Sequence, residues 1–145
     1  DVSHLSEGGF WDVVKHSKTP FMATHSNCRA LKDHTRNLTD DQIRALGEKG
    51  GVMGMCLAKN FLMEGPDEGR MDALVAHVEH ARKIGGLDIV AIGTDFDGTS
   101  TNHEFNQITD IQKLADRLKA IGYSDDELEK IFWRNALRVI HEVLL

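Results

Sequence analysis

The chain has 145 residues, and 41% of them are hydrophobic, which is enough apolar material for the core of one domain. Its 23 acidic residues outnumber its 17 lysines and arginines and give a net charge of -6 at pH 7, so binding to nucleic acid or anionic lipid is not expected. No apolar run approaches the roughly 20 residues that cross a bilayer, so no membrane segment is expected.

Short apolar runs alternate with longer helical patterns in the first part of the chain, which is typical of repeated βα units with a parallel sheet. Residues 1–5 are predicted to end a strand, and residues 10–14 to lie in the helix that follows it. Residues 20–26 are predicted to form a second strand that leads into a long polar loop. Thr39 and Gln42 then have the spacing of a capping box, which predicts the start of a short helix.

The alternation continues in the rest of the chain. Residues 51–57 are apolar on both faces, as expected for an interior strand of a parallel sheet. Apolar residues at spacings of three and four predict a helix over 71–84 that ends at two glycines. Residues 89–95 are predicted to form a strand whose end carries carboxylates. Two final helices are predicted over 108–121 and, from a second capping box, over 124–140.

The number of predicted strands sets the expected architecture. Four strands in 145 residues give about 36 residues for each βα unit. A complete (β/α)8 barrel has eight such units in about 250 residues, so the chain has the size of half a TIM barrel. We therefore expect an α/β fold of about four parallel βα units in one domain, residues 1–145. A small doubly wound sheet is the alternative.

Several polar side chains that could bind a metal or take part in catalysis are predicted at the same edge of the sheet. His4, His25 and Asp95 each lie at or just past the carboxyl end of a predicted strand, and Arg36 lies in the loop after the second strand. Neighbouring parallel strands would place the two histidines on one rim, where they could share a metal. Catalytic zinc usually has three protein ligands, so this pair does not complete a site. Hydrogen-bonded rim histidines are the alternative.

Two further sets of residues are expected to be structural. Cys28 and Cys56 are too few for a disulfide framework and form no CxxC motif, so we expect buried thiols and either a reducing compartment or no dependence on the compartment. No signal or anchor is visible in the sequence, and we expect a cytoplasmic location. His77 and His80 are three residues apart on the predicted helix over 71–84, and we expect them on its exposed side.

The segment around Asp95 permits a different chemistry. A strand that ends in Asp95-Phe96-Asp97-Gly98-Thr99 also fits the haloacid-dehalogenase phosphohydrolases, in which the first aspartate attacks phosphorus and the second is an acid/base beside magnesium. In that family the nucleophile strand normally comes near the start of the domain. Only 46 residues follow Thr99, and no further strand is predicted among them. A phosphohydrolase that uses Asp95 and Asp97 is therefore kept as an alternative.

Four short motifs occur along the chain in a fixed order. They are Asp1-Val2-Ser3-His4, Thr24-His25-Ser26, Arg36-Asn37-Leu38-Thr39-Asp40 and Gly93-Thr94-Asp95-Phe96-Asp97-Gly98. Together they resemble the second half of the membrane dipeptidase (renal dipeptidase) family of zinc peptidases. Residues 135–139 are similar to the final helix of that family, so the resemblance covers essentially the whole chain.

The resemblance implies a (β/α)8 barrel with a binuclear zinc centre at the carboxyl rim of its strands, of which residues 1–145 would form the C-terminal half. His4 and His25 match the two histidines that hold the second zinc. Arg36 matches the arginine that receives the substrate carboxylate, a role that suits a planar guanidinium. Asp95 matches the aspartate near the scissile peptide, which would handle protons and the substrate amino group. The implied reaction is hydrolysis of a dipeptide by metal-activated water.

Other family residues are not found in this sequence. The first-strand His-x-Asp pair, the bridging glutamate and a further substrate-contacting histidine belong to the first half of the family domain. We therefore expect Asp1 to mark a cut through a barrel and the isolated chain to be inactive. A half barrel exposes sheet edges and an apolar inner face, so we expect it to associate with the missing half or with another copy. A non-catalytic interaction module remains the other alternative.

Overall fold

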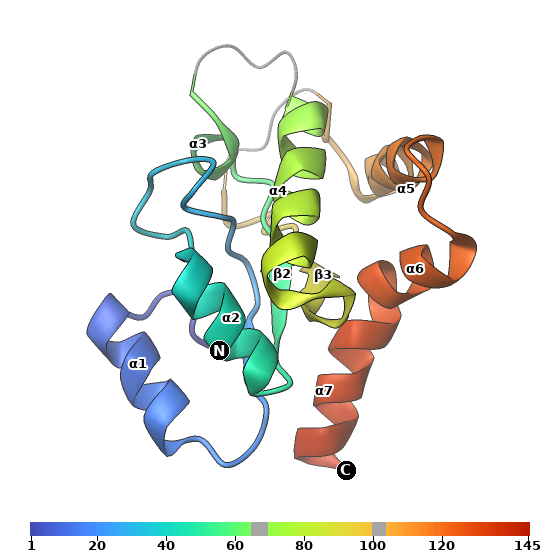
Figure 1. Cartoon of the computed structure of the whole chain (residues 1–145). Helices are drawn as coiled ribbons and strands as arrows, with labels where there is room; N and C mark the ends of the chain where they lie inside the picture. The colour runs from blue at the N-terminus through green and yellow to red at the C-terminus, as the bar shows by residue number, and fades with distance from the viewer. Residues whose placement is uncertain (65–69, 100–103) are drawn as a thin grey trace.

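The structure is a computed structural model, and it describes residues 1–64, 70–99 and 104–145. Its elements alternate along the chain as the sequence patterns predict (Figure 1). The helices are α1 (Glu7–His16), α2 (Asp40–Glu48), α3 (Lys59–Leu62), α4 (Arg70–Gly85), α5 (Ile111–Ala120), α6 (Asp125–Glu129) and α7 (Asn135–Leu144), with short helical turns η1 (Leu87–Ile89), η2 (Ile108–Asp110) and η3 (Lys130–Arg134). Among the described helices, none has the length and apolar character needed to cross a membrane.

The described strands form one parallel sheet, which confirms the α/β class. The strands are β1 (Met22–Ala23), β2 (Val52–Met55) and β3 (Val90–Ile92), and they lie in the order β1-β2-β3. Helices connect β1 to β2 and β2 to β3, and the strands are parallel, so all three carboxyl ends lie at the same edge of the sheet. That edge is the place where the predicted site residues have to meet.

The prediction of a first strand over residues 1–5 is wrong as a paired element. The Val2 N–H donates to the Met22 carbonyl at 2.8 Å, so the segment does lie beside β1. The Leu5 N–H then donates back to the Val2 carbonyl at 3.1 Å, and this turn ends the extended backbone before a ladder forms. The described residues therefore contain three paired strands, and a fourth segment that runs beside the edge of β1.

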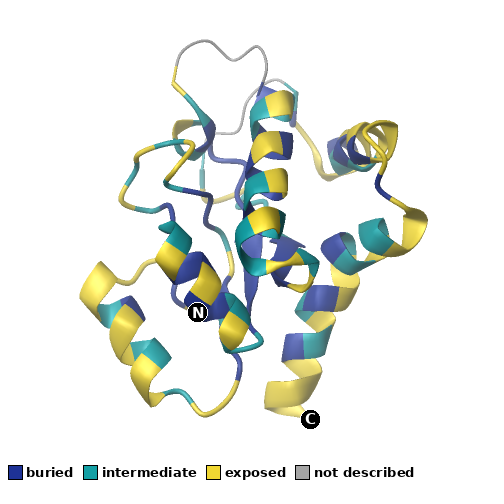
Figure 2. Ribbon diagram, in the orientation of Figure 1, coloured by how far each residue is buried: buried dark blue, intermediate teal, exposed yellow. Residues whose placement is uncertain are grey.

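Side chains of β2 are buried on both faces of the sheet, as predicted for an interior strand. Met53 and Met55 belong to the main core, which α2 and α4 cover on one side. Val52 points into a smaller cluster with Ala91 of β3 and Val139 of α7. Figure 2 shows the strands in dark blue among helices whose outer sides are yellow. The sheet is thus the centre of the molecule, and its carboxyl edge is held by packing on both faces.

Both predicted capping boxes are confirmed. The Thr39 hydroxyl accepts from the Gln42 N–H at 3.3 Å, while the Gln42 side chain accepts from the Thr39 N–H at 2.9 Å. Ser124 and Glu127 repeat the arrangement at the start of α6, at 3.2 Å and 2.9 Å. Such caps typically stabilise a helix by about 1 kcal/mol each.

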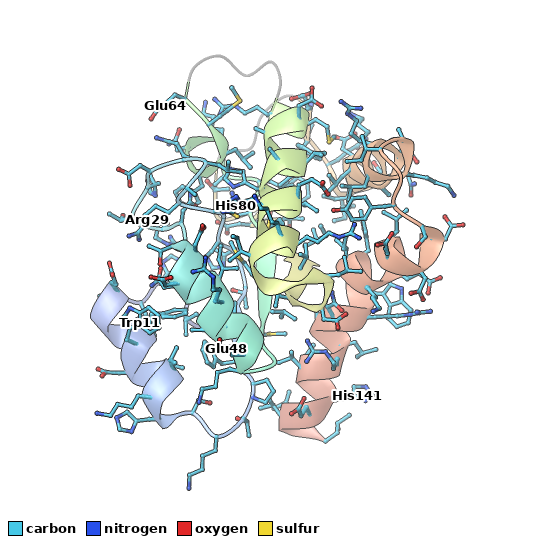
Figure 3. All side chains as sticks on the ribbon, in the orientation of Figure 1. Trp11, Arg29, Glu48, Glu64, His80 and His141 are labelled. Atoms are coloured by element: carbon cyan, nitrogen blue, oxygen red, sulfur yellow. The ribbon has the colours of Figure 1, made fainter. Side chains whose placement is uncertain are left out.

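The predicted exposure of His77 and His80 is wrong. His77 is fully buried, and its Nδ1 accepts from the Cys28 N–H at 3.0 Å. The proton of the neutral ring is therefore on Nε2, which donates to the Leu62 carbonyl at 2.9 Å. His80, labelled in Figure 3, contacts Asp40 at 2.7 Å across the start of α2. Helical periodicity identifies only one apolar stripe of α4. A second side of the helix is covered by the loop after β1 and by α3, whose backbone groups form the hydrogen bonds of the His77 imidazole.

The two thiols are buried and free, as predicted. Burial raises the pKa of Cys28 to about 12 and that of Cys56 to about 11. Both thiols therefore stay protonated and unreactive near neutral pH.

Burial lowers the pKa of His77 below its value of about 6.5 in the unfolded chain, so the fold holds the neutral ring. Its contribution to stability is complete above pH 6.5 and is lost as the pH falls below 6.5 toward the lowered pKa. We predict that His77→Gln lowers the free energy of unfolding by about 1 to 3 kcal/mol at pH 7.5. The same variant should lose less stability than the wild type between pH 7.5 and 5.5, as measured by urea unfolding.

The matched control for this prediction is His16→Gln, because His16 lies on the exposed side of α1. It should keep the pH dependence of the wild type. Equal pH dependence for His77→Gln and His16→Gln would contradict the role of the buried neutral ring.

Candidate functional site

Two imidazole rings meet at the carboxyl edge of the sheet. His25 comes two residues after β1, and His4 comes from the segment that runs beside β1. Their Nε2 atoms are 2.9 Å apart, with ring centroids 4.9 Å apart and ring planes inclined by 56°. Two nitrogens of the type that binds transition metals thus face the same point in space.

The donor set of this pair fits one shared metal ion. With zinc–nitrogen bonds of about 2.0 to 2.1 Å and a tetrahedral angle, two ligand nitrogens lie roughly 3.3 Å apart. The observed Nε2 separation of 2.9 Å is in the hydrogen-bonding range, so a movement of a few tenths of an ångström would admit the ion. In the part of the chain that the structure describes, no cluster of three or more His, Cys, Asp or Glu side chains could hold a metal. Further ligands would have to come from outside the described residues.

The electrostatic environment of His25 favours the neutral ring that metal binding requires. Partial burial lowers its pKa, and the positive charge of Arg36 and the neighbouring His4 lower it further, while the Asp95 carboxylate opposes them. Because the net effect is a lowered pKa, the imidazole is neutral at pH 7 and has a nitrogen lone pair available. This set of influences also places His4, Arg36 and Asp95 within electrostatic range of His25.

Ser3 connects the histidine pair to Arg36. The hydroxyl of this buried serine accepts from the backbone N–H of His25 at 2.9 Å. Its carbonyl accepts from Nε of Arg36 at 2.8 Å. The loop after β1 therefore folds back so that Arg36 lies beside the residue that precedes His4.

The Arg36 guanidinium packs against an aromatic ring, and one of its N–H donors has no partner among the described residues. It lies over the Phe61 ring at 5.3 Å, and the Arg36 backbone N–H donates to His34 at 3.1 Å. Its Nη2 atom is buried and has no hydrogen-bond partner among the described residues. A buried guanidinium N–H without an acceptor is costly, so this group is suited to receive a carboxylate.

Asp95 lies three residues past β3, in a backbone conformation that is uncommon for residues other than glycine. Its φ is 57°, in the left-handed region, which aspartate tolerates better than most residues. The Gly98 N–H donates to the Asp95 carbonyl at 3.1 Å and closes a turn. A Cβ atom on Gly98 would lie 2.2 Å from Oδ1 of Asp95, so glycine leaves room for the carboxylate. The turn holds this carboxylate at the same edge of the sheet as His25.

Two glycines fix the position of His25, a role that the sequence patterns did not predict although Gly93 belongs to one of the four motifs. The Thr24 carbonyl packs so closely on β2 and β3 that a Cβ on Gly54 would lie 2.1 Å from its oxygen, and one on Gly93 1.9 Å. The Ser26 N–H also donates to the Gly54 carbonyl at 2.9 Å. The available signal was a glycine inside or at the end of an apolar strand, which indicates a close approach of another backbone.

Comparison with known proteins links these residues to one family. The family model described as "Membrane dipeptidase (Peptidase family M19)" matches residues 1–144. A Klebsiella pneumoniae protein described only as "Uncharacterized protein in pqqA 5'region" is 41% identical over 149 residues, which cover 99% of this chain and 54% of that protein. "Dipeptidase tcpJ" of Claviceps purpurea is 30% identical over 146 residues, which cover 99% of this chain and 34% of that protein.

Solved structures agree with this match. The crystal structure of a Rhodobacter sphaeroides metallopeptidase, liganded with a phosphinate mimic of the dipeptide L-Ala-D-Ala, superposes with a TM-score of 0.93 at 34% identity. That match covers 98% of this chain and 41% of the Rhodobacter chain. The crystal structure of "dipeptidase AC", a metallopeptidase of family M19, also gives a TM-score of 0.93, at 33% identity, and covers 98% of this chain and 42% of that one.

The close packing of the Thr24 carbonyl makes Gly54 sensitive to the smallest side chain. We predict that Gly54→Ala lowers the free energy of unfolding by about 1 to 3 kcal/mol, because the added methyl group overpacks the contact. Gly8→Ala is the control, since a Cβ there has no described atom within 4 Å and the residue lies in α1. Urea unfolding that finds Gly54→Ala as stable as Gly8→Ala would show that the contact does not constrain the chain.

Proposed function

Because the chain belongs to the membrane dipeptidase family, M19, whose members are metallo-dipeptidases, we propose that it forms the C-terminal half of a (β/α)8 zinc dipeptidase. The observation that carries the proposal is the convergence of the Nε2 atoms of His4 and His25 at 2.9 Å, at the carboxyl edge of a parallel sheet. This edge is where barrels gather their active residues.

The chain spans about half the length, or less, of the relatives it matches. The proposal therefore assigns only part of a metal centre to it. His4 and His25 would bind one zinc of a binuclear centre, and the remaining ligands would come from outside the described residues. Alone, the chain is proposed to be inactive.

The site residues have distinct proposed tasks. Zinc held at the histidine pair would supply a nucleophilic water at neutral pH and polarise the peptide carbonyl. Arg36 would bind the substrate carboxylate through its spare buried donor. Asp95 would hold the substrate amino group and exchange protons at its carboxylate near the scissile bond. A dipeptide presents both a free carboxylate and a free amine, which is the pattern that Arg36 and Asp95 together could recognise.

The comparisons favour a dipeptide substrate over the phosphate ester that Asp95 and Asp97 would suggest. The Rhodobacter metallopeptidase binds a mimic of L-Ala-D-Ala, whereas the matched family is not one of phosphohydrolases. We therefore propose a dipeptide as the ligand of the site.

Exposed apolar surface supports association with further protein. Trp133 in η3 and Leu137, Ile140 and Leu144 in α7 are exposed and follow one another at spacings of four, three and four residues. These spacings place them along one side of the helix. Such a stripe typically marks a contact surface. We propose that the rest of the family domain, or a second copy of this chain, covers it.

The test is a chimera in which residues 1–145 replace the matching region of the Rhodobacter sphaeroides metallopeptidase. We predict that the purified chimera contains zinc and hydrolyses L-Ala-D-Ala, while the 145-residue chain alone does not hydrolyse it. His25→Gln in the chimera should lower both zinc content and activity, and His16→Gln should change neither. A folded chimera without zinc or hydrolysis would contradict the proposal and favour a non-catalytic interaction module.

The same chimera tests the task of Arg36. We predict that Arg36→Gln lowers kcat/KM for a dipeptide about 10- to 100-fold, mainly through KM, because a charge-assisted contact to the carboxylate is lost. It should lower kcat/KM much less for the matching dipeptide carboxamide, which has no carboxylate. Arg44→Gln, at an exposed position on α2, is the control. An equal loss of kcat/KM on both substrates would show that Arg36 does not bind the carboxylate.

A further inference from the structure

We propose that Asp1 and Thr24 are positioning residues that fix the tautomer of His25. In this arrangement the His25 proton lies on Nδ1, and the lone pair of Nε2 points at the shared metal position beside His4. The metal part of this inference rests on the proposed function, whereas the tautomer itself is set by contacts within this chain.

The tautomer follows from counting protons along one hydrogen-bonded chain. The Thr24 hydroxyl is 2.8 Å from Oδ2 of Asp1 and 2.8 Å from Nδ1 of His25. A hydroxyl has one proton, and an ionised carboxylate can only accept. The Thr24 hydroxyl therefore donates to Asp1 and accepts from Nδ1–H of His25. With its proton on Nδ1, the neutral ring has a lone pair on Nε2.

The Asp1 carboxylate, which sets the direction of these hydrogen bonds, is itself held by backbone N–H groups. Oδ1 of Asp1 accepts from the Ser3 N–H at 3.1 Å and from the Thr24 N–H at 3.0 Å. These two bonds join the segment that carries His4 to the segment that carries His25. The side chain of Asp1 thus sets both the distance between the two segments and the direction of the hydroxyl proton.

A neighbouring hydroxyl does not disturb this assignment. Oγ of Ser3 lies 3.4 Å from Oγ1 of Thr24 and accepts from the His25 backbone N–H at 2.9 Å. The Thr24 oxygen has two lone pairs, so it can accept from Nδ1–H and from the Ser3 hydroxyl together. The direction of the Thr24 proton toward Asp1 stays the same.

A carboxylate that orients a ligand histidine is a general way of tuning a metal site, and loss of such a partner typically lowers metal affinity 10- to 100-fold. Here the carboxylate would act through a hydroxyl. This gives a signature that a merely structural role would not have, because reversing the hydroxyl proton should reverse the tautomer of His25.

Asp1→Asn provides that reversal. The Asn oxygen would keep the two backbone N–H bonds that Oδ1 of Asp1 now accepts, so the amide NH2 would face the Thr24 hydroxyl. The hydroxyl would then accept from the amide and donate to Nδ1 of His25. The proton of His25 would move to Nε2, the atom that faces His4.

The experiment uses the chimera labelled with 15N-histidine. In the zinc-free protein, long-range 1H–15N spectra should show the Nδ1–H tautomer for His25, with its signals assigned by His25→Gln. Asp1→Asn should give the Nε2–H tautomer, and Thr24→Val should lose the preference for Nδ1–H. Zinc affinity, measured by competition with a chromophoric chelator, should fall 10- to 100-fold in both variants. Thr24→Ser keeps the hydroxyl and should restore most of the affinity.

The control is Thr19→Val at an exposed position before β1, which should behave as the wild type. An Nε2–H tautomer in the unmodified chimera, or an unchanged tautomer and affinity in Asp1→Asn, would overturn the inference. A chimera that shows the expected tautomer but binds no zinc would overturn the proposed function, and with it the metal-positioning task of Asp1 and Thr24. The two failures are therefore distinguishable.

Discussion

The close approach of the Thr24 carbonyl to Gly54 and Gly93 is the contact on which the rest of the site depends. The missing side chains at Gly54 in β2 and at Gly93 just after β3 let the backbone after β1 turn inward over the sheet, where a Cβ atom would come within about 2 Å of the carbonyl oxygen. This position of Thr24 places His25 against His4, and Ser3 extends the contact to Arg36 through its hydroxyl and its carbonyl. The small size of Gly54 and Gly93 thus allows the two imidazoles and the Arg36 guanidinium to lie close together.

Much of the fold could be predicted because its signals are local. The capping boxes at Thr39 and Ser124, the interior strand over 52–55 and the helix that ends at Gly85 each depend on neighbouring residues in the sequence. The rule that parallel strands bring their carboxyl ends together was enough to name His4, His25 and Asp95 as neighbours. Burial of His77 could not be predicted, because its partners are backbone groups 49 and 15 residues away. The hydrogen bonds of Asp1 with Thr24 were missed for the same reason, since they link residues 23 apart.

The polar groups at the sheet edge show which parts of a metal site the chain contributes and which parts it lacks. It supplies two imidazoles, a guanidinium with a buried N–H that has no acceptor among the described residues, and a carboxylate on a left-handed turn. The described residues supply no third metal ligand to the histidine pair, and an apolar stripe on α7 is exposed to solvent. Both features are explained if the metal centre and the barrel are completed by the same additional protein. Metal binding and catalysis would then depend on one interface.

The central claim is that His4 and His25 bind one metal through their Nε2 atoms. Its most direct test is a crystal structure of the zinc-loaded chimera with anomalous diffraction data collected at the zinc edge. The account predicts an anomalous peak about 2.0 to 2.1 Å from both Nε2 atoms, with their separation opened from 2.9 Å. Zinc bound elsewhere, or a histidine pair that keeps its direct hydrogen bond in the zinc-loaded protein, would contradict it.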